Sequence, residues 1–373
     1  MGNQPKKIKV MHICSSASWG GMEMIVARLA YLQKKAGIDS TVLSGQGAVL
    51  SSECKKLGVE AYPLSSGKFW PASFPTFVRK IKETAPDILH VHYSRDLNLA
   101  VPVKYFLGGA VVFTKHIGSY INKKDPWHRF IYRGVDRATA ISKLIKDNLA
   151  QTTPLAENKL DIVYLGTDTE RFKPDAMQRE STRKELGISN KTILIGMMGR
   201  ISYGKGYEDF IELANRVRED HVEFLFIGGH SRNEDRYGEK IEDEIKIKLG
   251  QKAHMTGFRE DREKYLQALD IFIFPSYAES FGLALTEAMA SGLPCVAYGK
   301  DGVLDIIDNG ADGLLAEARD TRDLYEKVRM LVNDYDLRVK LGLSGRAKVI
   351  GKFSDSQMLL GFERTYRMAL GDI

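Results

Sequence analysis

Two glutamates eight positions apart, Glu279 and Glu287, lie in the stretch YAESFGLALTEAMASGLP, which runs from residue 277 to residue 294. An apolar run precedes the stretch, and a helix is predicted to begin near Gly282 and to carry Glu287. Amides at a helix start attract phosphate or sugar oxygens, and a carboxylate accepts hydrogen bonds from two neighbouring hydroxyls. The pattern therefore predicts two diol-binding carboxylates on either side of an anion site. The alternative, a solvated loop glutamate and an exposed helix glutamate, is not separated from it by spacing alone.

A second stretch, GRISYGKGYEDF at residues 199–210, places Arg200 and Lys205 beside a glycine-rich turn between a predicted strand and a predicted helix. Such a turn frees backbone N–H groups, and two cations next to it suit a diphosphate. The spacing approaches that of a P-loop, but Gly206 stands where a Mg²⁺-binding Ser or Thr is required. An ATPase is therefore disfavoured. The ordinary alternative is a tight turn with solvated charges.

Both stretches belong to a chain in which short apolar runs alternate with helical segments, which is typical of βαβ units and parallel sheets. Apolar runs at 8–14, 87–93 and 110–116 predict strands in the first half. The alternation breaks near residues 160–175 and restarts at 191–200. Ligands of open parallel sheets collect beyond the carboxyl ends of the strands. We therefore expect two α/β domains, with the informative residues at strand ends in both.

The motifs resemble those of the retaining glycosyltransferases of family 4. The segment ESFGLALTEAMASGLPCVA is similar to the E-x7-E signature of that family, and GRISYGKG resembles its donor-phosphate turn. Looser similarities are SWGGMEMIVARLA at 18–30, GTDTERFKP at 166–174 and GKDGVLDIIDNGADGLL at 299–315. The resemblance covers nearly the whole chain in the family's order. It implies the GT-B fold: two facing Rossmann-like, doubly wound α/β domains with an interdomain cleft.

The resemblance also implies domain boundaries and roles. Residues 1–170 would form the acceptor-binding domain and 171–353 the nucleotide-sugar-binding domain, while a helix in 354–373 would pack back on the first domain. Catalytic roles fall to His116, Glu279, Arg200 and Lys205. Besides Arg200, Lys205 and Glu279, the donor-binding residues would be Gly20, Gly21, Gly228, Gly229, Gly257, Phe258, Phe281, Gly282, Leu283 and Glu287. His92 and Lys115 are expected on the acceptor side.

The implied reaction breaks a sugar–phosphate bond. Arg200, Lys205 and helix-terminal amides would stabilise the charge that develops on the diphosphate. In the family, the leaving phosphate is thought to help deprotonate the acceptor on the same face, so that configuration is retained. A double displacement with Glu279 as the nucleophile is the alternative. Since two cations neutralise the diphosphate, we expect neither a metal nor another cofactor.

Composition limits the partners. The chain has 373 residues and a net charge of +6, and residues 1–170 hold 23 basic against 14 acidic side chains. A basic amphipathic segment at 68–83, with Trp70 near its start, and a basic cluster at 121–137 can lie on an anionic membrane. The ordinary alternative is a helix packed on its own sheet. The three cysteines are scattered, and the sequence shows no signal peptide or membrane-spanning run, so we expect a cytoplasmic protein that can associate with the inner face of the membrane.

Two motifs have simpler interpretations. His90 and His92 share one strand face, but no third metal ligand is evident, so structural or acceptor-side histidines are favoured over a metal pair. The DYD at 334–336 imitates a metal motif of another transferase class, yet it falls between predicted helices, and chance explains it better.

We therefore expect a metal-independent retaining glycosyltransferase that uses a nucleotide-diphosphate sugar, with UDP as the expected nucleotide and a lipid-linked or cell-envelope glycan as the acceptor. Transfer to a small soluble acceptor is an alternative. A nucleotide-sugar epimerase or hydrolase of the same architecture is a second hypothesis. A non-catalytic nucleic-acid binder is a third, and it lacks the interleaved basic and aromatic residues of such proteins.

Overall fold

The structure is a computed structural model that describes residues 7–64, 74–217, 219–230 and 235–372. The chain divides into two compact units: residues 1–165 with 355–373, and residues 166–354. The first unit ends at Leu165, where the sequence predicted a boundary at 170. Trp70 and its neighbours 68–73 lie outside the described residues.

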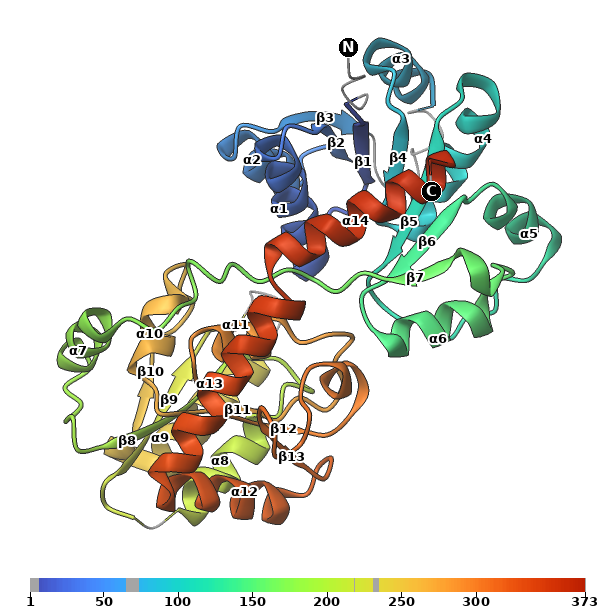
Figure 1. Ribbon diagram of the computed structural model, residues 1–373. Coiled ribbons are helices and arrows are strands. Elements are labelled where there is room, and N and C mark those ends of the chain that lie inside the picture. The colour runs from blue at the N-terminus through green and yellow to red at the C-terminus, as the bar shows by residue number, and fades with distance from the viewer. Residues whose placement is uncertain (1–6, 65–73, 218, 231–234, 373) are drawn as a thin grey trace. The chain divides into compact units, whose positions relative to one another are not determined.

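The described part of the first unit contains a seven-stranded parallel sheet in the order β3-β2-β1-β4-β5-β6-β7 (Figure 1). Its strands are β1 (Lys9–Cys14), β2 (Asp39–Gly45), β3 (Glu60–Leu64), β4 (Ile88–Val91), β5 (Ala110–Lys115), β6 (Arg137–Ala140) and β7 (Leu160–Ile162). Its helices are α1 (Gly21–Lys35), α2 (Val49–Lys56), α3 (Phe74–Thr84), α4 (Leu97–Leu107), α5 (Pro126–Arg133), α6 (Lys143–Thr152) and α14 (Asp355–Leu370). The strand β7 lies inside the segment that the sequence presented as a break.

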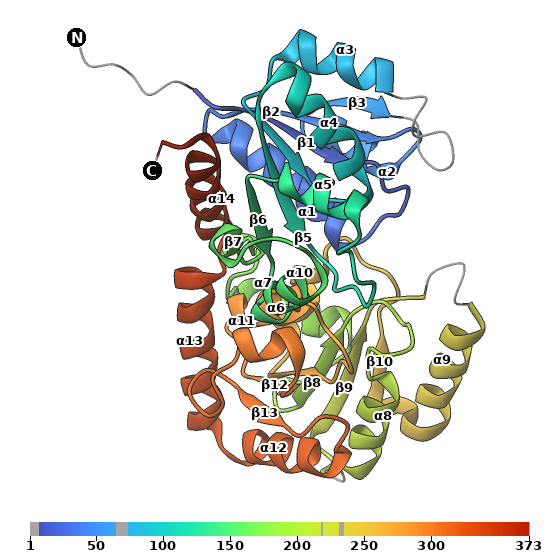
Figure 2. The ribbon, with the colours of Figure 1, turned by 90° about the vertical axis from the view of Figure 1, so that its right-hand side faces the viewer.

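The described part of the second unit contains a six-stranded parallel sheet in the order β10-β9-β8-β11-β12-β13. Its strands are β8 (Ile193–Met198), β9 (Val222–Ile227), β10 (Ala253–Met255), β11 (Ile271–Phe274), β12 (Cys295–Tyr298) and β13 (Leu314–Ala316). Its helices are α7 (Ala176–Glu185), α8 (Tyr207–Arg216), α9 (Asp235–Leu249), α10 (Arg262–Ala268), α11 (Leu283–Ala290), α12 (Thr321–Asn333) and α13 (Tyr335–Lys352). In Figure 2, α8 and α9 lie side by side, and α13 packs against α11.

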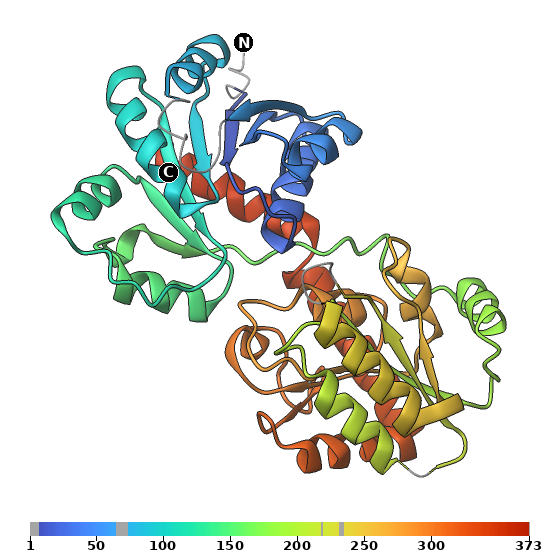
Figure 3. The same cartoon turned by 180° about the vertical axis from the view of Figure 1, so that it is seen from behind.

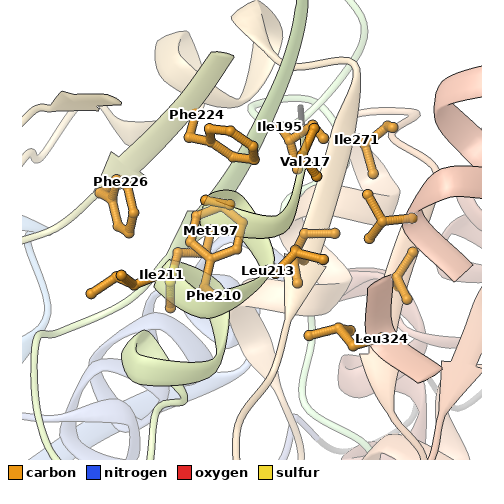
Figure 4. Packing of buried hydrophobic residues seen from close by; sticks show 14 of the residues in the cluster. Ile195, Met197, Phe210, Ile211, Leu213, Val217, Phe224, Phe226, Ile271 and Leu324 are labelled. Atoms are coloured by element: carbon orange, nitrogen blue, oxygen red, sulfur yellow. The ribbon is translucent and has the colours of Figure 1, made fainter. Parts of the chain in front are cut away.

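Alternation of apolar residues explains how the second sheet buries one face. Ile195 and Met197 of β8 and Phe224 and Phe226 of β9 point to the same side, since successive strand residues face opposite ways. They meet the apolar stripe of α8, including Phe210, in a cluster that α12 completes (Figure 4). This packing fixes the position of β8, whose carboxyl end leads into the glycine-rich turn.

The second sheet has the strand order 3-2-1-4-5-6 of Rossmann-like folds, and the first has the same order with a seventh strand, β7, added beside β6. In this order the direction of strand addition reverses between the first and the fourth strand. In the first unit the reversal lies between β1 and β4, and in the second between β8 and β11. Loops that leave these strands at their carboxyl ends are adjacent at such a point. The turn after β8 and the stretch after β11 are the two in which the sequence placed Lys205 and Glu279.

The last helix returns to the first unit, as the sequence led us to expect. It packs against α1, β5 and β6, and Figure 3 shows it from behind. Arg28 of α1 donates a hydrogen bond from Nε to Asp355 Oδ2 at 3.1 Å. No helix among the described residues is long and apolar enough to cross a membrane.

Candidate functional site

The turn after β8 is held in place by close backbone contacts. Gly206 has a φ of 76°, and a Cβ at this position would lie 2.0 Å from the carbonyl oxygen of Pro275. The N–H of Tyr277 donates to the carbonyl oxygen of Gly204 at 2.8 Å. The turn after β8 is therefore attached directly to the segment after β11.

This attachment brings two of the predicted site residues together. The ammonium group of Lys205 forms an ion pair with the carboxylate of Glu279. Both side chains are partly exposed, at 34% and 16%. A cation suited to a phosphate and an acceptor of sugar hydroxyls therefore lie within one hydrogen bond of each other. Arg200 follows β8 directly and is exposed.

The Glu279 segment continues into α11 through Gly282, whose φ is 120°. Gly302 supports the loop: its N–H donates to the carbonyl oxygen of Glu279 at 2.9 Å, and a Cβ on Gly302 would lie 2.5 Å from the carbonyl oxygen of Ser280. The N–H of Leu285 donates to the carbonyl oxygen of Gly282 at 3.1 Å. The start of a helix carries partial positive charge that favours an anion, and the side chain of Phe281 beside it is buried.

Glu287 lies on the first turns of α11 and is buried, at 5% exposure. Its carboxylate is held by Arg262, whose Nε lies 3.0 Å from Oε2 and whose Nη2 lies 2.5 Å from Oε1. A carboxylate offers about four acceptor positions, so this bidentate pair orients Glu287 and leaves acceptor positions for ligand hydroxyls. Arg262, the first residue of α10, was not among the site residues predicted from the sequence.

The four residues expected near the nucleotide base also meet. Gly228 and Gly257 form an isolated antiparallel bridge. A Cβ on Gly228 would lie 1.9 Å from the carbonyl oxygen of Gly199, so glycine is required where β9 ends beside the turn. The carbonyl oxygen of Gly229 accepts a hydrogen bond from the Ile201 N–H at 3.0 Å. Phe258 is 78% exposed and presents an aromatic face.

In the first unit, Gly20 is the N-cap residue of α1, and Gly21 is the first residue of that helix. The N–H of Gly20 donates to Glu23 Oε2 at 3.0 Å, which is the glutamate half of a capping box. A Cβ on Gly21 would meet nothing within 4 Å. The first turn of α1 is therefore stabilised by its own sequence.

His116 and Lys115 end β5 and are both buried. His116 Nε2 lies 3.2 Å from His92 Nδ1. Burial lowers the pKa of His116 to about 3, so the imidazole is neutral at pH 7. Burial and the nearby charge of Lys123 lower the pKa of Lys115 to about 8.

The structure corrects the sequence reading of the histidine pair. His12 of β1 joins His90 and His92, and one ligand atom from each lies within 4.8 Å of the others. However, His12 contacts His92 through Nδ1 and Gln33 through Nε2, at 2.9 and 2.8 Å. His90 contacts Tyr366 and Thr114 through its two ring nitrogens, at 2.8 and 2.6 Å. The cluster is therefore a hydrogen-bonded row in which these nitrogens already have protein partners.

The other expected metal motif, the DYD at 334–336, lies where α12 meets α13. Asp334 is the N-cap of α13 and accepts a hydrogen bond from the Leu337 N–H at 2.9 Å. Its role there is to start a helix.

A cavity of about 290 Å³ lies in the first unit beside α4 and α5, and it is lined by Tyr93, Ser94, Arg95, Leu97, Asn98, Lys123, His128, Ile131 and Tyr132. Lys115 reaches its edge, where Nζ donates to Ser94 Oγ at 3.3 Å. Burial lowers the pKa of Lys123. A bound anion stabilises the charged form of neighbouring lysines whose pKa values burial has lowered, so this cavity suits an anionic group.

Comparison with known structures gives the class of the protein. A crystal structure of a glycosyltransferase from Rickettsia africae superposes with a TM-score of 0.89 at 20% identity, over 99% of this chain and 100% of that one. The paired Rossmann-like units thus define the GT-B class of folds, and the predicted fold class is confirmed.

Sequence comparison then gives the family. The model described as "Glycosyltransferase Family 4" matches residues 19–171, and the model "Glycosyl transferases group 1" matches residues 178–348. Each half of the chain therefore matches a glycosyltransferase family model, which bears out the resemblance to family 4 that the motifs indicated.

Curated relatives fall within the same group. A Campylobacter jejuni N,N'-diacetylbacillosaminyl-diphospho-undecaprenol alpha-1,3-N-acetylgalactosaminyltransferase is 31% identical over 50% of this chain and 49% of its own. An Escherichia coli UDP-Gal:alpha-D-GlcNAc-diphosphoundecaprenol alpha-1,3-galactosyltransferase is 25% identical over 76% of this chain and 75% of its own. For four of the curated relatives, the matched region spans only 49% to 61% of their own length.

Proposed function

We propose that this protein is a retaining glycosyltransferase that moves a sugar from a nucleotide-diphosphate sugar to a hydroxyl group. The observation that carries the proposal is the ion pair of Lys205 and Glu279 at the strand-order reversal of the second sheet. In this assignment Lys205 and Arg200 bind the diphosphate, Glu279 binds sugar hydroxyls and Glu287 binds the ribose. We take the nucleotide to be UDP, because the E. coli relative is named for a UDP-sugar.

In this proposal, the main catalytic task of the site is to stabilise the diphosphate as it leaves the sugar. When the donor binds, Lys205 exchanges its contact with Glu279 for phosphate oxygens, and the freed carboxylate accepts sugar hydroxyls. The amides at the start of α11 add fixed partial positive charge where negative charge develops. Neither step requires a metal ion, so we propose metal-independent transfer, in which the leaving phosphate accepts the proton of the attacking hydroxyl.

The donor assignment is tested with Lys205→Ala and Glu287→Ala in full-length protein. Loss of one stabilising electrostatic group costs about 100- to 1,000-fold in kcat, and we expect Lys205→Ala to fall in that range. Glu287→Ala should raise the donor KM and abolish the thermal shift that UDP produces. Lys191→Ala, at the opposite end of β8, is the matched control and should behave as wild type. Near-normal transfer by Lys205→Ala would refute the proposal.

For the acceptor, we propose a lipid-linked diphosphate glycan. Both relatives described above are named for diphospho-undecaprenol acceptors. The cavity beside α4 and α5 offers Arg95 and Lys123 to a diphosphate. Next to it, Trp127 donates from Nε1 to Asn98 Oδ1 at 2.9 Å, and its ring lies 5.8 Å from that of Phe130.

The same surface supports association with an anionic membrane at its cytoplasmic face. Large apolar side chains are exposed on α4, α5 and the segment between β5 and α5: Tyr105, Phe106, Ile117, Ile121, Trp127 and Phe130. Lys124, Arg129 and Arg133 are exposed among them. Exposed aromatic residues with interspersed cations are typical of interfacial contact with anionic lipid. By contrast, Phe77 and Ile81 of α3 are buried, so that helix uses its apolar side for packing.

The acceptor proposal is tested by comparing a polyprenyl-diphosphate glycan with the same glycan on a neutral alkyl chain. Hydrogen bonds to charged groups contribute about 1.5–3 kcal/mol, so Lys123→Ala should raise the KM for the diphosphate acceptor about tenfold or more and leave the neutral one unchanged. Lys55→Ala, an exposed position on α2 of the same unit, is the control. In vesicles of anionic lipid, Trp127→Ala should bind more weakly than wild type. Equal KM values for both acceptors in wild type and Lys123→Ala would remove the diphosphate from the proposal.

A further inference from the structure

The buried histidines form part of a longer row of side chains on one face of the first sheet. His12 of β1 pairs in register with His90 of β4, and Thr114 of β5 with Thr139 of β6. Residues that are paired in parallel strands point to the same face. The row therefore crosses four neighbouring strands, and α1 and α14 contribute Gln33 and Tyr366 to it.

Hydrogen bonds connect the row without a gap. From His116 the bonds run through His92, His12, Gln33, Tyr366, His90 and Thr114 to Thr139, with heavy-atom distances between 2.6 and 3.2 Å. The seven residues from His92 to Thr139 are each at most 2% exposed. Burial lowers the pKa of all four histidines, so each imidazole is neutral and carries a single N–H.

A neutral imidazole that bonds through both nitrogens donates on one side and accepts on the other. The direction of one bond therefore fixes the direction of the bonds along the run of imidazoles His12, His92 and His116. Gln33 sets that direction: its Nε2 donates to Tyr366 Oη at 2.8 Å, and its Oε1 accepts from His12 Nε2 at 2.8 Å. His12 must then accept at Nδ1 from His92, which in turn must accept at Nδ1 from His116.

We propose that Gln33 and Tyr366 are positioning residues, which hold His116 as the Nε2–H tautomer with an unprotonated Nδ1. In that form His116 keeps one hydrogen-bond acceptor for a substrate hydroxyl, and the inward bond to His92 fixes its ring. The proposal rests on the proposed transferase function, in which His116 lies at the end of β5 near the reacting sugar. It gives the C-terminal helix a part in the reaction, since Tyr366 belongs to α14.

Gln33 divides the row into a His12 arm, which leads to His116, and a Tyr366 arm, which leads to Thr139. Three substitutions test the two arms separately. Gln33→Met removes the group that sets the direction, so His116 should populate both tautomers. Tyr366→Phe removes the hydroxyl that accepts from Gln33 and should have the same effect more mildly. Gln33→Glu still accepts from His12, and it should restore the His116 tautomer even though the Tyr366 arm changes.

The experiment is nitrogen-15 NMR of the histidine rings in the full-length protein, where protonated and unprotonated ring nitrogens resonate far apart. The chain has eight histidines, and His116→Gln assigns the resonance of interest. We expect wild type and Gln33→Glu to show protonated Nε2 and unprotonated Nδ1 at His116. Gln33→Met should move both resonances toward intermediate values. A protonated Nδ1 in wild type, or unchanged resonances in Gln33→Met, would overturn the proposal.

Kinetics supply a second readout. Loss of the partner that orients a metal-bound histidine costs about 10- to 100-fold in activity. We expect Gln33→Met to lower kcat by a similar factor, with little change in donor KM. Circular dichroism and thermal unfolding of Tyr366→Phe, the milder variant, control for misfolding. If wild type transfers no sugar, the proposed function fails while the NMR result still decides the tautomer. If wild type is active and Gln33→Met shifts the resonances without lowering kcat, the positioning role fails alone.

Discussion

At the scale of single residues, the second unit holds its two proposed donor-binding carboxylates in different ways. Glu279 and Lys205 are partly exposed and paired with each other, so a ligand can replace either partner. Glu287 is buried and held by two bonds from Arg262. The guanidinium carbon of Arg262 also lies 5.4 Å from the ring centre of Phe172. Contacts with Glu287 and Phe172 thus hold Arg262 on two sides, and the two bonds from Arg262 fix the orientation of the Glu287 carboxylate.

This arrangement predicts that Arg262→Lys is not a conservative change. A lysine keeps the charge but cannot form two parallel bonds to one carboxylate. The lost charged hydrogen bond is worth about 1.5–3 kcal/mol, so the dissociation constant for UDP should rise about tenfold or more. Titration calorimetry measures it. Arg171→Lys, whose partner Glu263 is more exposed, is the control; an equal effect of both changes would contradict the prediction.

Sequence patterns pointed to the residues proposed to bind the donor, but not to the residues that support them. Glu279, Glu287, Arg200 and Lys205 stand beside glycines at strand ends, and such local signals are visible in one stretch of chain. Arg262 lies 25 residues before Glu287, on another helix. The sequence around Arg262 contains no motif that indicates this contact. The third histidine had a weak signal, since KVMHIC and ILHV both place a polar residue in a buried apolar run.

At the scale of elements, the turn between β8 and α8 depends on two separate properties of glycine. Gly206 has a φ of 76°, which disfavours other residues, and its α-carbon lies against Pro275. Gly187 has a similar φ of 72°, but a Cβ there would meet nothing within 4 Å. The pair therefore separates backbone strain from steric clash.

We predict that Gly206→Ala destabilises the second unit far more than Gly187→Ala. The shared backbone penalty is about 1–2 kcal/mol, while the clash with Pro275 forces the loops after β8 and β11 apart. Gly206→Ala should therefore also lose donor binding. Urea unfolding followed by circular dichroism, together with a UDP titration, measures both effects. Comparable midpoints for the two variants would show that the close approach contributes nothing.

The alternation of strands and helices was predictable because each βαβ unit carries its own apolar pattern. The exceptions are short or polar elements. The strand β7 has only three residues and pairs at the edge of its sheet, beside β6. The helix α7 is strongly polar, with buried Thr182 and Arg183. Their positions depend on tertiary contacts, such as the bond from Arg183 Nη1 to the carbonyl oxygen of Ala268 at 2.8 Å.

At the scale of the whole molecule, the two units should respond differently to acid. The four buried histidines of the first unit have lowered pKa values, about 4 for His12 and about 3 for His116. Between these values and the pKa near 6.5 of an unfolded histidine, unfolding takes up protons. The stability of the first unit therefore falls as pH falls below about 6.5. Asp96 opposes this with one proton, because burial raises its pKa to about 6.

We predict a loss of up to about 1.4 kcal/mol of unfolding free energy per pH unit for each histidine that stays neutral in the folded state. All three tryptophans, Trp19, Trp70 and Trp127, belong to the first unit. Urea unfolding followed by tryptophan fluorescence from pH 7.5 to 4.5 therefore reports that unit, and circular dichroism reports both. A fluorescence midpoint that does not move over this range would contradict the prediction.

The position of α14 has a consequence for biosynthesis. Residues 166–354 form a continuous unit, whereas the first unit takes its last helix from residues 355–373. During translation, the middle of the chain can therefore reach its final structure before the beginning of the chain does. Until Tyr366 has left the exit tunnel, the sheet of the first unit lacks the hydroxyl group that His90 and Gln33 both contact.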